Sequence, residues 1–237
     1  MTLDGAPGQG LSLLRNGPES APLLLLVHGT PGSAEGFSDY VLNPPRGMQV
    51  VALDRPGFGH SGPAGAVTSL DTQAAAVAAL LPGNGRPVVL LGHSLGGAIA
   101  ARVAALWPER VQGLVLLAAS LDPAQESIHP MQHVGAWGPV RTLLPRAIRN
   151  ANAELMALLP ELQTLAPLLP RITAKVLIVH GTLDDLVPVA NVAYMQAQLT
   201  GARCVKTVLL EGANHFLPWN ASDAVRDAIH QALEPGC

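Results

Sequence analysis

The sequence contains little charge, and what it has is nearly balanced. Charged residues make up 13% of the 237 residues, and the formal net charge is −3. Only Lys175 and Lys206 are lysines; the other basic residues are arginines spread along the chain. Proteins that hold nucleic acid present clustered basic side chains to the phosphates. Nucleic acid is therefore not an expected partner.

Long hydrophobic runs and a secretory leader are also lacking. The strongest aliphatic run extends from Leu23 to Val27, whereas a membrane-spanning helix needs about 20 apolar residues. The segment Met1 to Gly5 has neither the basic nor the apolar region of a signal peptide. We therefore expect no membrane insertion and a cytoplasmic location, with a periplasmic or secreted origin after removal of a signal as the alternative.

Cysteine and aromatic residues are scarce. The two cysteines, Cys204 and Cys237, are too few for a disulfide framework, and we expect both to be free thiols in a reducing compartment. The chain has three tryptophans, two tyrosines and three phenylalanines. A substrate pocket is thus expected to be mainly aliphatic, with Phe216 or Trp137 as occasional walls and leucines such as Leu143, Leu144 and Leu158 around them.

Apolar segments of strand length alternate with segments of helical pattern along most of the chain. Because most of these strands are apolar on both faces, the pattern predicts an α/β protein with a mostly parallel sheet covered by helices on both sides. Residues 1–120 and 174–237 form the expected core. Residues 121–173 contain seven prolines and break the alternation, so this segment is predicted to be a helical lid or cap inserted into the core.

A serine lies between a predicted strand and a predicted helix in Gly92-His93-Ser94-Leu95-Gly96. The run 87–91 before it is apolar, and residues 98–106 after it form helices readily. A serine on such a sharp turn projects its hydroxyl above the sheet edge, which is the context of a nucleophile elbow. The sequence predicts Ser94 as a nucleophile.

A serine nucleophile needs a base and a group that orients the base. His215 follows the last predicted strand and is our candidate base, whereas His230 falls within a helix. Asp184 is the preferred acid, with Asp185 and Asp122 as alternatives. The developing oxyanion would be bound by the backbone N–H of Leu95, at the start of the helix, and that of Thr30, after an early strand.

Five segments together resemble the α/β-hydrolase superfamily, over nearly the whole chain: 28–33 (His-Gly-Thr-Pro-Gly-Ser), 54–61, 92–97, 181–184 and 212–215. The resemblance implies an eight-stranded, mostly parallel sheet with the lid after the sixth strand. It also implies the triad Ser94, Asp184 and His215. His28 and Gly29 are added as candidate substrate-binding residues beside Trp137 and Phe216.

The function expected from these residues is hydrolysis of small to medium carboxylic esters through an acyl-enzyme, as in a carboxylesterase. The same triad serves C–C bond hydrolases, lactonases and perhydrolases, and some relatives of this shape are ligand receptors with slow turnover. No cofactor is expected. His129 and His133 are four residues apart but lack a third ligand, so no metal site is expected either. Nothing in the sequence indicates the oligomeric state.

Overall fold

The structure, a computed structural model, describes residues 10–237, so Met1 to Gly5, on which the signal-peptide argument depends, lie outside the described residues. Within this range the strands form a single sheet in the order β1-β3-β2-β4-β5-β6-β7, with β1 antiparallel to β3 and all other pairs parallel. The predicted α/β class is confirmed.

The described residues hold seven strands rather than the expected eight. The strands are β1 (Leu13–Asn16), β2 (Leu23–Val27), β3 (Gln49–Leu53), β4 (Val88–His93), β5 (Gly113–Leu117), β6 (Lys175–Gly181) and β7 (Cys204–Leu210).

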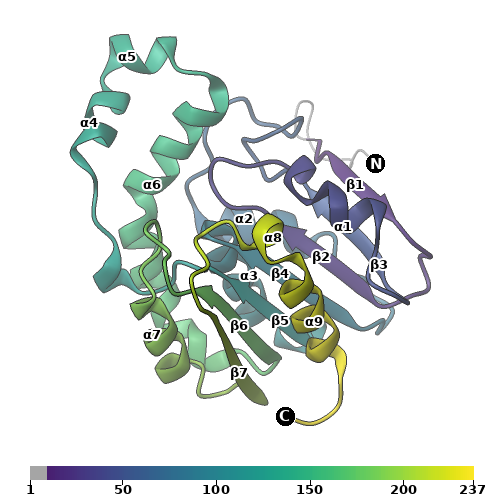
Figure 1. Cartoon of the computed structure of the whole chain (residues 1–237). Coiled ribbons are helices and arrows are strands. Elements are labelled where there is room, and N and C mark those ends of the chain that lie inside the picture. Colours follow the sequence, from purple (N-terminus) through teal and green to yellow (C-terminus); the bar gives the residue numbers. More distant parts are fainter. Residues whose placement is uncertain (1–9) are drawn as a thin grey trace.

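The sheet is covered on both faces (Figure 1). On one face lie α1 (Ser38–Leu42) and α9 (Ser222–Leu233); on the other lie α2 (Leu70–Ala78), α3 (Leu95–Leu106) and α7 (Ala190–Gln198). Every residue of β2, β3, β4, β5 and β6 is buried, as strands of a doubly covered parallel sheet should be. Short helices complete the core: η1 (Ala34–Phe37), η2 (Pro108–Arg110) and α8 (Leu217–Asn220).

The segment between β5 and β6 is helical and has two unlike halves. It contains η3 (Pro123–Gln125), α4 (Pro130–Ala136), α5 (Gly138–Leu143), α6 (Arg146–Leu165) and η4 (Ala166–Arg171). We call residues 128–145 the outer arm; it projects from the molecule and contains no buried residue (Figure 1). In contrast, α6 buries Leu158, Leu162 and Leu165 against the core.

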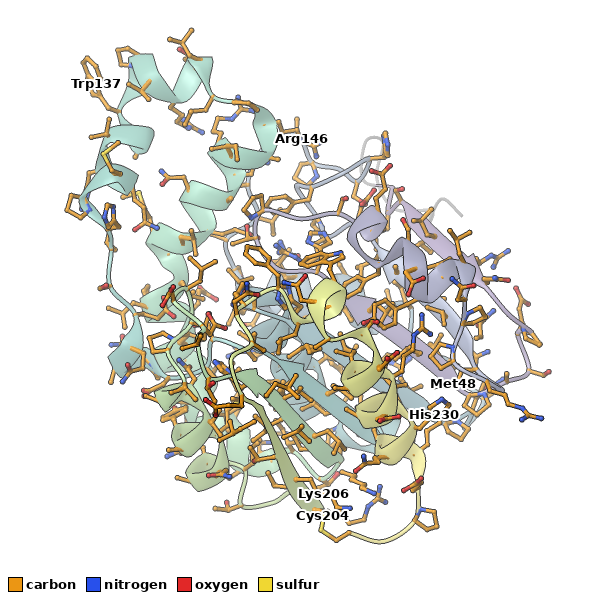
Figure 2. All side chains as sticks on the ribbon, in the orientation of Figure 1. Met48, Trp137, Arg146, Cys204, Lys206 and His230 are labelled. Carbon is orange, nitrogen blue, oxygen red and sulfur yellow. A yellow bond between two sulfur atoms is a disulfide. The ribbon has the colours of Figure 1, made fainter. Side chains whose placement is uncertain are left out.

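The prediction of two free thiols is wrong. Cys204, the first residue of β7, forms a disulfide with Cys237, and their Cα atoms are 5.4 Å apart. After α9 the C-terminal tail turns back toward this end of β7, which brings residues 33 positions apart into contact (Figures 1 and 2). Structural disulfides persist mainly in oxidising compartments. The cysteines therefore give no support to a cytoplasmic location. None of the described helices is both long and apolar enough to cross a membrane.

Candidate active site

Ser94 lies in a strained turn between β4 and α3. Its backbone has φ 56° and ψ −128°, a conformation that non-glycine residues rarely adopt. The flanking glycines are required by space: a Cβ on Gly92 would lie 2.2 Å from the carbonyl oxygen of Gly96, and one on Gly96 would lie 2.3 Å from that of Val27. The Gly-x-Ser-x-Gly pattern thus lets strand and helix meet closely with the serine at the turn.

His215 and Asp184 come together from two different loops. The Nδ1 atom of His215 is 2.8 Å from Oδ2 of Asp184, and both side chains are almost fully buried. The other carboxylate oxygen accepts the N–H groups of Leu186, at 3.0 Å, and Val187, at 2.8 Å. Burial by itself raises the pKa of Asp184, but these hydrogen bonds outweigh it and hold the pKa below its usual value. Asp184 is therefore ionised and well oriented to fix the His215 ring.

Two further histidines hold this pair in place. His93 donates from Nε2 to the carbonyl of His215, at 3.0 Å, and His180 donates to the carbonyl of Val187, at 2.9 Å. Burial, followed by the proximity of His215, lowers the pKa of His93 to about 4. His93 is thus neutral at pH 7, and its N–H is available for the bond to His215.

Neither alternative acid is hydrogen-bonded to His215. Asp122 caps η3 by accepting the N–H of Ala124 at 2.9 Å. Asp185 is exposed to solvent, and so is His230 on α9, which Figure 2 shows far from the loops after the strands. Of the candidate acids, Asp184 is the one that the structure brings to His215.

The loop after β2 passes directly against the serine. A Cβ on Gly29 would lie 2.8 Å from the Cβ of Ser94, so only glycine allows this approach. Thr30 follows at once. Leu95, the residue after Ser94, is the first residue of α3, where a backbone N–H has no acceptor within its own helix. One candidate oxyanion donor thus follows Ser94 in the chain, and the other follows Gly29, which closely approaches Ser94.

A cavity of about 1010 Å³ unites these groups. Its lining includes Ser94, His215, Leu95, Thr30, His28, Gly29 and Phe216. Half of the chain's eight aromatic side chains also line it (Phe37, Phe58, Phe216 and Trp219), together with aliphatic residues such as Leu155, Leu158, Ile148 and Leu186. The walls are thus more aromatic than the composition suggested.

Trp137 is not brought to this cavity. It lies at the outer end of the arm, 64% exposed, and is not among the lining residues (Figure 2). Leu143, on the same arm, is 85% exposed and also absent from the lining, whereas Leu158 is buried and lines it. The sequence could not show that the predicted lid turns its apolar residues in two directions.

Trp219 lines the cavity and was missed in the sequence. It packs edge-on against His93, with ring centroids 5.7 Å apart, and donates its Nε1 hydrogen to the carbonyl of Gly36. A tryptophan four residues after the predicted base, in a chain poor in aromatics, was a usable signal. Arg55 and Glu154 were missed as well: both are buried charged residues, and no local pattern marks them as partners.

No metal centre is apparent in the described part of the chain, where no three His, Cys, Asp or Glu side chains gather as ligands. His129 accepts the N–H of Met131 and caps α4, while His133 is exposed.

The model of the alpha/beta hydrolase fold family matches residues 22–142, which is about half of the chain. The chain belongs to the α/β-hydrolase family. The matched part of the chain includes the loop after β2 and the Ser94 turn, whereas Asp184 and His215 lie beyond it.

Three relatives illustrate the similarity. Lipase LipV of Mycobacterium tuberculosis is 37% identical over 48% of this chain and 42% of its own length. The pimeloyl-[acyl-carrier protein] methyl ester esterase of Aeromonas hydrophila is 28% identical over 82% of the chain and 88% of the relative. The structure of a monoacylglycerol lipase from Paleococcus ferrophilus has a TM-score of 0.77 at 21% identity and covers 94% of this chain and 98% of that one, which shows a shared fold. The chain aligns with less than half the length of the first few curated relatives.

Proposed function

We propose that this α/β hydrolase cleaves carboxylic esters of small to medium acyl chains through Ser94, His215 and Asp184. One observation carries the proposal: the 2.8 Å bond from His215 to the buried Asp184, in the same cavity as the serine of a strained elbow. An esterase and a lipase among the relatives support the ester bond as the target.

In the proposed reaction Ser94 attacks the carbonyl carbon while His215 removes the hydroxyl proton. Asp184 holds the imidazole in the tautomer with hydrogen on Nδ1 and stabilises the cation that forms. The N–H groups of Leu95 and Thr30 bind the negative oxygen of the tetrahedral intermediate. His215 then protonates the leaving alcohol, and a water molecule that it deprotonates releases the acid. The ionised state of Asp184, favoured by its hydrogen bonds, suits this role.

The test is covalent labelling with a fluorophosphonate probe, followed by turnover of p-nitrophenyl esters of increasing chain length. We expect one label per chain, none on Ser94→Ala, and a loss of at least ~10³-fold in kcat for that variant. Labelling that survives Ser94→Ala would overturn the proposal.

A substrate panel separates the ester from the other bonds that such a triad can break. Lactones, vinylogous diketones and a perhydrolysis assay would be run beside the esters, with ligand-induced stabilisation as the readout for a receptor. Fast ester turnover supports the proposal. Faster cleavage of a C–C bond or a lactone, or stabilisation without turnover, contradicts it.

A further inference from the structure

The proposed oxyanion donor, the N–H of Thr30, belongs to the peptide unit that joins Gly29 to Thr30. The carbonyl of Gly29 and the N–H of Thr30 belong to one planar trans peptide, so they point in opposite directions. Whatever holds the Gly29 oxygen therefore also sets the direction of the Thr30 N–H. Two groups hold it: the Nδ1 hydrogen of His28, at 2.7 Å, and the guanidinium of Arg55, at 3.0 Å.

Arg55 forms hydrogen bonds with two carbonyl groups of the loop after β2. Besides the Gly29 oxygen, it donates from Nε to the carbonyl of His28 at 2.9 Å. Its side chain is completely buried and lies over the Phe58 ring, with the guanidinium carbon 4.7 Å from the centroid. A buried guanidinium needs a counter-charge to remain in one position.

That counter-charge comes from α6. Glu154 binds both terminal nitrogens of Arg55, at 2.7 and 3.0 Å, and is itself 3% exposed. Gln73 of α2 donates a further bond to the same carboxylate at 3.1 Å. A continuous buried path thus runs from α6 through Glu154 and Arg55 to the peptide beside the nucleophile.

We propose that Glu154 is a positioning residue for the oxyanion hole: it holds Arg55 against the Gly29 carbonyl and so directs the Thr30 N–H toward the reacting oxygen. This inference rests on the proposed ester hydrolysis. It makes the docking of α6 a condition for stabilising the transition state. Buried ion pairs are often replaceable by apolar side chains without loss of stability, so the pair can be removed as a unit to test its effect on catalysis.

The decisive variant is the double substitution Arg55→Met with Glu154→Met. It removes both charges together, so no unpaired ion is left in the core, and thermal unfolding should show a folded protein. Glu154→Gln is the second variant, and it keeps the size of the side chain while removing its charge. Glu161→Gln is the matched control: Glu161 lies on the same helix and accepts the N–H of Leu70 at 2.7 Å, but it is not part of this path.

The readouts are kcat and KM on one activated ester and the inhibition constant of a trifluoromethyl ketone, which mimics the tetrahedral intermediate. Removing one oxyanion donor costs about 10²–10³-fold in kcat. Because His28 still holds the Gly29 oxygen, we expect a smaller loss for the double variant and for Glu154→Gln, roughly 10- to 100-fold in kcat. KM should change little, and the ketone should bind more weakly by a similar factor. Glu161→Gln should match the wild type.

A folded double variant with wild-type kcat and ketone affinity would overturn the inference, as would a loss confined to KM. These outcomes differ from failure of the proposed function itself, in which the wild-type protein would neither take the fluorophosphonate on Ser94 nor cleave esters. That failure would remove the role of Glu154 as well.

Discussion

The outer arm and α6 are consecutive parts of one insertion, yet they relate to the core in opposite ways. The arm exposes five large apolar side chains, whereas α6 buries three leucines and leaves Ile148 exposed (exposed on the arm: Ile128, Met131, Val134, Trp137 and Leu143; buried on α6: Leu158, Leu162 and Leu165). The arm has no buried residue, whereas α6 also contributes the buried carboxylate of Glu154.

The junction between the two halves is itself tied to the core. Arg146, the first residue of α6, donates to the carbonyls of Gly59, Ser61, Pro63 and Ala64, so the chain is fastened where the arm ends (Figure 2). A lid defined by residues 121–173 is thus better described as a docked helix that builds the cavity and an arm that extends beyond it.

The largest expected effect tests whether the catalytic acid lies on a core loop or at the start of the insertion. Asp184→Asn should lose about 10⁴-fold in kcat because the base loses its tautomer and its counter-charge. Asp122→Asn, at the start of the insertion, should keep most of its activity, and so should the exposed Asp185→Asn. The measurement is kcat for all three on one activated ester, with circular dichroism to confirm folding. A crippled Asp122→Asn beside an active Asp184→Asn would move the acid into the insertion.

The second prediction compares a leucine from each half. Leu158→Ala should lower the free energy of unfolding by about 2–5 kcal/mol, as large-to-small changes in a packed core do. Leu143→Ala should change it by no more than about 0.5 kcal/mol because the side chain is exposed. Urea denaturation measures both. Because Leu158 lines the cavity, its variant should also shift the preference among p-nitrophenyl esters. A shift caused by Leu143→Ala instead would show that the arm folds over the cavity.

The third prediction compares buried histidines of the core with exposed histidines of the arm. The folded-state pKa of His93 is about 4, below its usual 6.5, chiefly because the ring is buried and secondly because it lies beside His215. The hydrogen bond to the His215 carbonyl and the charge of Asp184 offset part of this lowering of the pKa. Between these values the unfolded chain binds more protons, so the stability from His93 is complete above pH 6.5 and declines as the pH falls toward 4. The full effect is about 3 kcal/mol. Burial also lowers the pKa of His28 and His180, so they add to it.

The corresponding experiment follows the free energy of unfolding from pH 7 to pH 4. His93→Gln should reduce the slope, while His129→Gln and His133→Gln on the arm should leave it unchanged. An unchanged slope for His93→Gln would show that protonation of His93 does not cause the loss of stability at low pH.

Most of the core could be predicted because its signals are local. A window of a few residues is enough to recognise each of these signals: an aliphatic run of strand length, a serine between such a run and a helix former, and a histidine after the last strand. The pairing of Asp184 with His215 was harder because Asp184 and Asp185 are adjacent and chemically alike. Two backbone N–H groups, from Leu186 and Val187, decide between them by turning one carboxylate inward.

Local sequence alone specifies the alternation of strands and helices and the place of the Ser94 turn. Gly92, for example, is required because a Cβ there would meet Gly96, four residues along the chain. The packing of distant segments established the other features. It joined Cys204 to Cys237, separated the arm from α6, and connected Glu154 to Arg55 across 99 residues. Such contacts form between segments far apart in the chain, and they depend on how completed elements pack, which no local pattern of residues contains.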